Sequence, residues 1–176
     1  MNIGLRVLLG YFLIVALAAL LVGKVFVEQV KPGVRQAMEG TLIDTANTLA
    51  ELASDDMLAG RIADGRFARR LRAVQARKLD ADVWGFAKDR SGFRVTVTDA
   101  RGIVVFDSEG KDLGRDNSRW NDVYRTLRGE YGARSTRDDP DDEMSSVMYV
   151  AAPIRDASGR IAGVLTVSKP NRSIQP

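Results

Sequence analysis

The chain has 176 residues, with 26 Lys and Arg against 23 Asp and Glu, and a formal net charge of +3. It contains no Cys and no His, which excludes disulfides, thiolate or imidazole metal sites, and catalysis that relies on either side chain. The small net charge gives no indication of a nucleic-acid partner. No phosphate-binding glycine loop or metal motif is present, so we expect no cofactor, no metal and no enzymatic activity from this chain itself.

Residues 1–27 form an apolar segment. No residue in Val7–Gly23 is charged. A helix needs roughly 20 apolar residues to cross a hydrocarbon core of about 30 Å, a length that is reached if Lys24 extends its ammonium to the interface. Arg6 precedes the apolar run with no acid nearby, which favours a cytoplasmic N-terminus. We therefore predict a transmembrane anchor, with the chain from about residue 28 onward outside the cytoplasmic membrane.

A cleaved signal peptide is the alternative interpretation of this segment. Ala16–Ala18 has the small-x-small spacing of a cleavage site. The apolar run continues for several positions beyond it, which favours an uncleaved anchor. A buried helix of a soluble protein would seldom be apolar on all sides over this length.

Residues 28–60 have the pattern of a helix that continues from the anchor. Pro32 lacks a backbone donor, so we expect a kink or a short break there. Beyond it, apolar residues recur at helical spacing on one stripe: Leu42, Ala46, Leu49, Ala50, Ala53 and Met57. The stripe fits the core of a domain, and a helix that leaves a membrane also makes a natural seam for a homodimer.

A second helix is predicted over residues 64–79, where Phe67, Leu71 and Val74 form an apolar line. Its other faces are strongly basic and carry Arg66, Arg69, Arg70, Arg72, Arg77 and Lys78. Two interpretations stay open: a solvated helix surface, and a surface that attracts anionic lipid headgroups or an anionic ligand.

From Phe93 the apolar period becomes strand-like. Residues 93–99 alternate between apolar and polar, and residues 103–108 follow as a mostly apolar strand. The turn Asp99–Gly102 joins them, because Asp bonds its own backbone and Gly supplies a positive φ. The same turn chemistry recurs at Asp156–Gly159, so a second hairpin is predicted with strands over 149–155 and 160–168.

One helix lies between the two hairpins. Ser118 fits its N-cap, Gly129 fits its C-terminal end, and Trp120, Val123, Tyr124 and Leu127 follow at helical spacing. A middle strand is predicted over residues 131–137. Pro153 has no backbone N–H to donate to a neighbouring strand, so we expect it at a bulge or an edge position. The order of elements predicts an α+β domain with about five antiparallel strands and its helices on one side.

An acidic loop follows the middle strand. Asp138, Asp139, Asp141, Asp142 and Glu143 surround Pro140. Such oxygens suit Ca²⁺ or Mg²⁺, but no fixed ligand spacing is present. A solvated loop is the preferred interpretation, and we predict no metal site.

Residues 97–108, 114–116, 149–154 and 163–168 together resemble the extracytoplasmic PAS-like, or Cache, sensor domains of bacterial membrane receptors. Further segments are similar to the sensory region of bacterial sensor histidine kinases: residues 8–12, 33–35, 39–46, 118–123 and 131–136. The likeness extends through nearly the whole chain and is weakest over residues 59–92.

The resemblance implies a PAS-like domain over residues 61–170, preceded by the anchor over 1–27 and a juxtamembrane signalling helix over 28–60. It implies a two-component sensor kinase in the inner membrane, with residues 171–176 starting a linker to a second membrane helix and a kinase core. The implied partners are the membrane, a small-molecule or physical signal, a second copy in a homodimer, and a response regulator reached through the kinase. The alternative is a tethered Cache-type module without a kinase, which could bind a protein through a patch around Trp84 and Phe86.

In a PAS-like fold a ligand lies between the sheet and the segment that covers it, here residues 110–134. The ligand-binding candidates are Arg119, Trp120, Asn121 and Tyr124, with Arg134, Tyr149 and Asp107 added from strand ends and inner faces. Arg suits a carboxylate through its fork of donors, and Trp and Tyr can enclose an apolar or ammonium-bearing group. The spacing of Trp120 and Tyr124 also fits a core stripe, which would leave Arg119 and Asn121 on the surface.

Overall fold

The computed structural model describes residues 3–26, 31–79, 81–83, 86–88, 92–137 and 146–170. The chain divides into two units, residues 1–40 and residues 41–176, and each is described by itself. Some predicted features lie outside the described residues: residues 28–30, Trp84 and the side chain of Phe86, the acidic loop 138–143, and residues 171–176.

The first unit contains α1, Ile3–Val25, and the beginning of α2, Lys31–Leu58. α1 is long and apolar enough to cross a membrane, and none of its residues is buried. The prediction of an anchor-length apolar helix is thus confirmed. Pro32 lies in the first turn of α2, where a proline is tolerated because its missing N–H would have no partner within the helix. The predicted kink or break at Pro32 therefore corresponds to the beginning of α2.

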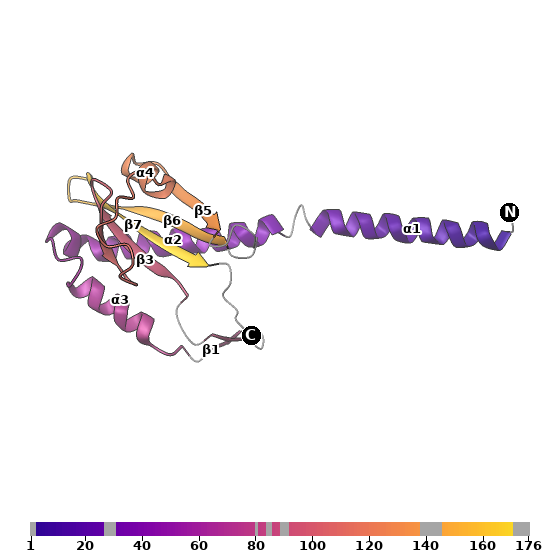
Figure 1. The fold of residues 1–176 in the computed structure, drawn as a ribbon, viewed down its shortest axis with the longest axis horizontal. Helices are drawn as coiled ribbons and strands as arrows, with labels where there is room; N and C mark the ends of the chain where they lie inside the picture. Colours follow the sequence, from indigo (N-terminus) through magenta and orange to yellow (C-terminus); the bar gives the residue numbers. More distant parts are fainter. Residues whose placement is uncertain are drawn as a thin grey trace. The chain divides into compact units, whose positions relative to one another are not determined.

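A five-stranded antiparallel sheet forms the centre of the second unit (Figure 1). Its strands run in the order β4-β3-β7-β6-β5. The bounds are β3 Arg94–Asp99, β4 Val104–Asp107, β5 Gly132–Arg137, β6 Ser146–Arg155 and β7 Ile161–Pro170. The predicted α+β class with about five antiparallel strands is confirmed.

Both predicted hairpin turns have the expected local chemistry. Asp99 accepts hydrogen bonds through Oδ1 from the backbone N–H groups of Arg101 and Ile103, at 2.9 and 3.0 Å. Gly102 has a φ of +85°, which other residues rarely adopt. Asp156 makes the equivalent pair of bonds in the second turn. The turns form from short-range chemistry alone, and therefore could be read from the sequence.

α2, from Thr41 onward, and α3, Arg66–Ala76, pack on one face of the sheet. A Cβ added at Gly163 would come within 2.8 Å of Met57 on α2, and the ring of Phe67 on α3 lies edge-on to Phe106 on β4 at 5.9 Å. The predicted stripe of α2 is used here, since Leu42, Ala46, Ala50 and Ala53 are all buried.

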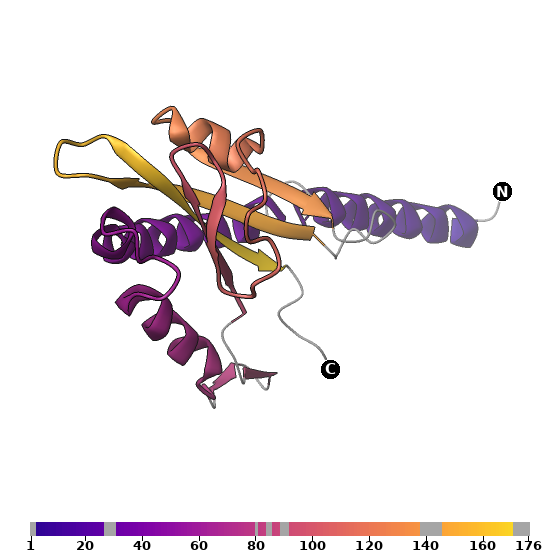
Figure 2. The ribbon, with the colours of Figure 1, turned by 60° about the vertical axis from the view of Figure 1, so that its left-hand side comes forward.

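α4, Asn121–Leu127, covers the opposite face of the sheet (Figure 2). Val123 packs against Ala151 of β6 and Val164 of β7. Val164 neighbours Gly163 in the strand, and successive side chains of a strand point to opposite faces. The expectation that all helices lie on one side of the sheet is therefore wrong: α2 and α3 cover one face, and α4 covers the other.

A two-stranded hairpin of β1, Ala81–Val83, and β2, Phe86–Lys88, was not predicted. Its strands are three residues long, too short to establish an apolar period. Pro153 meets the expectation for a strand proline. β5 pairs with β6 only as far as Ala151, so Pro153 is paired only with β7.

Candidate functional site

A row of polar side chains crosses the sheet on the face covered by α4. The registers place Arg94 of β3 opposite Ser168 of β7, Ser168 opposite Tyr149 of β6, and Tyr149 opposite Arg134 of β5. Residues directly opposite in adjacent strands point to the same face. The face is that of α4, because Tyr149 alternates in phase with Ala151, which packs against Val123. Four strands thus contribute one polar row beneath the cover.

Arg134 of the edge strand β5 forms one end of this row. Its Nε donates a hydrogen bond of 2.7 Å to Oδ1 of Asp122 on α4. The guanidinium also lies 3.4 Å from the ring centre of Tyr149 and 3.9 Å from that of Trp120. The Asp122 side chain is 2% exposed and that of Arg134 is 14% exposed. A buried ion pair is therefore held between two aromatic rings, where charge and π-face attraction act in little water.

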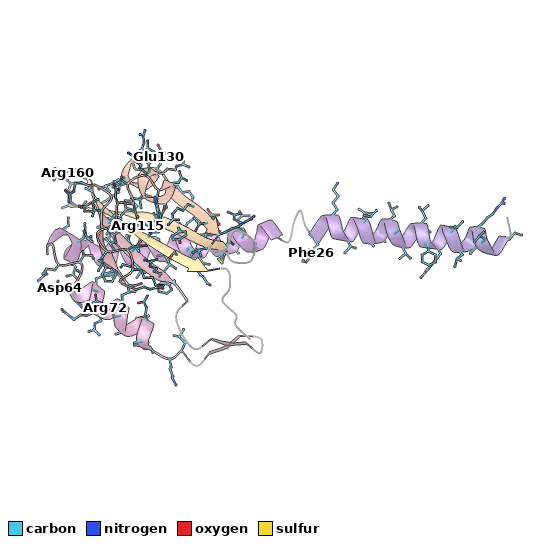
Figure 3. The ribbon with its side chains drawn as sticks, viewed as in Figure 1. Phe26, Asp64, Arg72, Arg115, Glu130 and Arg160 are labelled. Carbon is cyan, nitrogen blue, oxygen red and sulfur yellow. The ribbon has the colours of Figure 1, made fainter. Side chains whose placement is uncertain are left out.

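Trp120 is contacted by a second guanidinium. Arg115, labelled in Figure 3, comes from the loop after β4 and lies 4.6 Å from the Trp120 ring centre. Its Nη1 donates to Oδ1 of Asp112 at 3.1 Å. The indole therefore joins Arg115 in the loop to Arg134 in the sheet, and it does so just before α4 begins at Asn121.

At the other end of the row, Arg94 is bound by two carboxylates. Its Nε donates to Oδ1 of Asp107 at 2.9 Å, and its Nη2 contacts both Asp107 and Asp112. Asp107 also accepts hydrogen bonds from the backbone N–H groups of Glu109 and Asp112. Asp112 is therefore shared between Arg94 and Arg115, which links the row to the loop.

The surroundings of Asp107 favour its ionised form. Burial alone would raise the pKa of this carboxyl, but hydrogen bonds from Arg94 and from two backbone N–H groups outweigh burial and lower the pKa to about 2. The hydrogen bond to Asp107, opposed by burial, raises the pKa of the Arg94 guanidinium further above its ordinary value. Both groups stay charged over the physiological pH range.

Buried polar atoms without a protein partner lie close to α4. Oγ1 of Thr98 and Oγ1 of Thr126 have no hydrogen-bond partner within the described part of the chain. Thr98 pairs with Val164, which places it on the α4 face, and a Cβ added at Gly132 would meet the Thr126 hydroxyl. The contact between α4 and the sheet thus includes hydroxyls as well as charges, unlike an ordinary apolar core.

Four of the seven predicted ligand-binding residues are brought to this face. Trp120 and Tyr149 both contact the guanidinium of Arg134. Asp107 belongs to the same face, since it pairs with Thr96, two residues from Arg94 in β3. Sequence reasoning therefore found both aromatic residues of the cluster and one member of each buried ion pair.

Arg119, Asn121 and Tyr124 were also ligand-binding candidates, but they lie outside the cluster. Arg119 is exposed. Asn121 uses its amide to donate to the carbonyl of Ala133 at 2.9 Å, which fastens α4 to β5. Tyr124 is 48% exposed, and its hydroxyl accepts from Arg128.

The rotational phase of α4 explains why Tyr124 lies outside the cluster. Its buried residues are Asp122, Val123 and Thr126, so the predicted core stripe through Tyr124 was wrong by about one position. Trp120 is only half buried and precedes the helix as its N-cap, a position predicted for Ser118.

Sequence reasoning missed Asp122, Arg94 and Arg115. Asp122 stands among apolar residues and gave no periodic signal. Arg94 did give one, because it occupies the same phase as Thr96 and Thr98 in the alternating segment that became β3. That phase predicts a polar inner face and could have pointed to Arg94.

The arrangement suits binding rather than catalysis. Arg94, Arg115 and Arg134 provide forks that match carboxylates or other planar anions, and their present partners are carboxylates of the same chain. Among the described residues, no group of acidic side chains is placed to hold a metal ion.

A bacterial sensor protein resembles the chain over its full length. It is 56% identical over 176 residues, its whole length, to the sensor protein CreC of Escherichia coli strain K12. The resemblance to bacterial membrane sensors is confirmed. The chain spans 37% of the length of CreC. No family model matches the chain.

Solved sensor domains give weaker structural similarity. The sensor domain of the histidine kinase DctB from V. cholerae has a TM-score of 0.48 and 15% identity, covering 85% of this chain and 58% of that one. The periplasmic domain of Vibrio cholerae LuxQ has a TM-score of 0.36 and 16% identity, covering 74% and 56%. The E. coli DcuS sensor domain has a TM-score of 0.34 and 21% identity, covering 43% and 53%.

Proposed function

We propose that this chain is the extracytoplasmic signal-sensing region of a membrane-bound two-component sensor histidine kinase. The observation that carries the proposal is the 56% identity to the sensor protein CreC over the whole chain. α1 serves as the inner-membrane anchor, with the domain in the periplasm because Arg6 favours a cytoplasmic N-terminus. The chain has no His to accept a phosphoryl group, so autophosphorylation and transfer to a response regulator belong to a kinase portion outside it.

The proposed stimulus site is the cluster around Arg134, Trp120 and Tyr149 beneath α4. A small molecule with a carboxylate or similar anionic group would compete with Asp122 for the Arg134 guanidinium. Exchange of one carboxylate for another gives two discrete arrangements of α4 on the sheet. A ligand shifts such an equilibrium only if it binds the two arrangements unequally, which this exchange provides.

Transmission then depends on α2, which runs from Lys31 to Leu58 as one element. Movement of the domain on the α2 stripe would reach the membrane as a shift or rotation of this helix. We further propose that two copies form a homodimer. In such a dimer, α2 of one copy can move relative to α2 of the other.

A tethered module without a kinase is the second candidate function. It would bind a partner protein and would need no coupling between the α4 face and the membrane. The two candidates differ in one measurable property, since only the sensor proposal requires this chain to control a kinase.

A chimera tests the proposal directly. The region of E. coli CreC that this chain matches is replaced by residues 1–176, and the chimera is produced in cells lacking CreC. We expect output that differs between growth media, measured as phosphorylation of the response regulator. The control is a chimera that keeps residues 1–40 but has an unrelated folded domain in place of 41–176. Equal, unregulated output from both chimeras at equal membrane abundance would contradict the sensor proposal and favour the tethered module.

A further inference from the structure

A buried hydrogen bond joins α3 to the C-terminal end of α2. The backbone N–H of Phe67, in the first turn of α3, donates at 2.6 Å to Oδ2 of Asp56 on α2. Asp56 is 6% exposed, so this bond is sheltered from water. Elsewhere the two helices line an open groove of about 710 Å³. Asp56 is therefore a polar joint between helices that are otherwise separated by a groove.

The backbone around Asp56 is shaped to permit this contact. Gly65 precedes α3 with a φ of −69°, which any residue can adopt. A Cβ at this position would come within 2.4 Å of the Asp56 carboxylate, so the contact requires glycine although the backbone conformation does not. The connection between the helices is also fixed, since the N–H of Arg61 donates to the carbonyl of Asp56 at 2.8 Å and the N–H of Gly65 donates to the carbonyl of Arg61.

Beyond this joint, α3 is attached to the hairpin of β3 and β4. The ring of Phe67 lies edge-on to that of Phe106, and the guanidinium of Arg72, labelled in Figure 3, lies 5.6 Å from the Phe106 ring centre. Nε2 of Gln75 donates to the carbonyl of Phe93 at 3.1 Å. α3 thus contacts β4 through Phe106 and the beginning of β3 through Phe93.

Both attachment points are the chain neighbours of a buried ion pair on the opposite face. Phe93 precedes Arg94, and Phe106 precedes Asp107. Successive side chains of a strand point to opposite faces, so α3 holds the hairpin from one face while the Arg94–Asp107 pair lies on the α4 face. A change of partners at this ion pair therefore moves the backbone to which α3 is attached.

We propose that Asp56 is a positioning residue for signal transmission, which makes α2 follow α3 when the Arg94–Asp107 end of the polar row moves. The proposal rests on the sensor function proposed above and assigns its route from the α4 face to the signalling helix. The buried stripe of α2 is mostly alanine, and apolar packing is non-directional, so the stripe allows α2 to slide on the sheet. The hydrogen bond at Asp56 is directional and determines which movement of the sheet reaches α2.

Amide hydrogen exchange tests the route, measured by NMR on the full 176-residue chain in detergent. Asp107→Asn removes a charge on the α4 face. It should accelerate exchange of the Phe67 N–H at least about fivefold, because altered packing at Phe106 opens the joint locally. The control is Asp99→Asn, at the opposite end of the same hairpin, which should leave the rate within about twofold. Equal exchange at Phe67 in the two variants overturns the proposal.

Coupling between two sites is reciprocal, so the reverse direction gives a second test. The reporter is the N–H of Asp112, which donates to Oδ2 of Asp107 at 2.8 Å. Asp56→Ala, and independently Gly65→Ala, whose Cβ displaces the Asp56 carboxylate, should each accelerate its exchange at least about fivefold. Asp56→Asn keeps an acceptor for the α3 N–H and should restore the parent rate, and Asp55→Ala, at an exposed neighbouring position, is the matched control.

The rescue separates a directional joint from general loss of structure. Unchanged exchange at Asp112 in both Asp56→Ala and Gly65→Ala overturns the coupling. Equal acceleration in Asp56→Ala, Asp56→Asn and Asp55→Ala does so as well, because the effect then does not depend on the acceptor at Asp56.

The CreC chimera measures whether output uses this route. At matched membrane abundance, Asp56→Ala should lose the difference in output between growth media, and Asp56→Asn should keep it. A retained difference in Asp56→Ala overturns the role of Asp56 in transmission. A parent chimera without regulated output contradicts the sensor proposal instead, and the exchange measurements, which use neither a kinase nor a stimulus, still decide the coupling.

Discussion

The two faces of the central sheet are both covered by helices, yet they are built from different chemistry. The face toward α2 and α3 carries fully buried aliphatic side chains, including Val95, Val97, Val150, Leu165 and Val167, each at most 1% exposed. The face toward α4 carries arginines and hydroxyls from β3, β5 and β7, including Arg94, Thr98, Arg134, Thr166 and Ser168. Strand alternation produces both faces from single segments.

The difference between the two faces indicates that one face provides stability and the other provides the response to a ligand. Aliphatic packing is non-directional and roughly proportional to the buried area, so the face toward α2 and α3 supplies most of the folding free energy. Ion pairs such as Arg134–Asp122 contribute little net stability relative to a packed apolar core, but they have discrete partners that a ligand can exchange. One face therefore maintains the fold, and the other can change partners without unfolding it.

The largest expected effect is loss of a core side chain on the aliphatic face. Leu165→Ala removes a fully buried side chain and leaves a cavity, so we expect the free energy of unfolding to fall by about 4 kcal/mol. Denaturant unfolding of the full chain in detergent measures this loss. The matched control is Leu113→Ala, at an exposed position, which should change stability by less than about 0.5 kcal/mol. Equal losses would show that the aliphatic face is not the stabilising one.

The next effect concerns the buried ion pair beneath α4. Asp122→Asn keeps the side-chain volume but leaves the Arg134 guanidinium without its counter-charge in a buried position, which should cost about 3 kcal/mol. Glu130→Gln provides the control, because its ion pair with Arg125 is about half exposed and should contribute at most about 1 kcal/mol. If the two substitutions cost the same, the α4 face is solvated and the comparison between faces fails.

A pH dependence is expected from Asp107. Its pKa is about 2 in the folded chain and 3.8 as an unperturbed group, so the pairing stabilises the fold above pH 4 and is lost as the pH falls through 2. The loss should be about 2 kcal/mol. The comparison is acid unfolding of the parent with that of Asp107→Asn, which should be less stable at pH 7 and show a shallower decline between pH 4 and 2. Parallel pH profiles would contradict the pairing with Arg94.

The smallest effect is expected at Arg119. This residue is exposed, outside the cluster, so Arg119→Ala should change stability by less than about 0.5 kcal/mol and leave regulated output of the CreC chimera unchanged. Reduced output from a stable, equally abundant Arg119→Ala chimera would return Arg119 to the stimulus site and shift that site toward the outer surface of α4.

Local chemistry decided what the sequence could predict. The Asp99 and Asp156 turns, the anchor helix and the α2 stripe depend on neighbouring residues or on long periodic runs, and all were predicted correctly. α4 has seven residues, so two turns of pattern could not fix its phase, and Tyr124 was exchanged for Asp122 as a buried residue. The partners of Arg94 and Arg134 depend on strand registers and on the position of α4, neither of which a single sequence specifies.

We propose that the α4 face is the sensing face of the domain. Two variants of the CreC chimera test it most directly, Arg134→Gln on the α4 face and Ile154→Ala on the aliphatic face, each expected to cost about 3 kcal/mol of stability. Response-regulator phosphorylation is measured in the two growth media between which the parent chimera differs most, at matched membrane abundance. We predict that Arg134→Gln abolishes the difference between media while Ile154→Ala keeps it. Retention of the difference by Arg134→Gln, or equal loss in both variants, would contradict the claim.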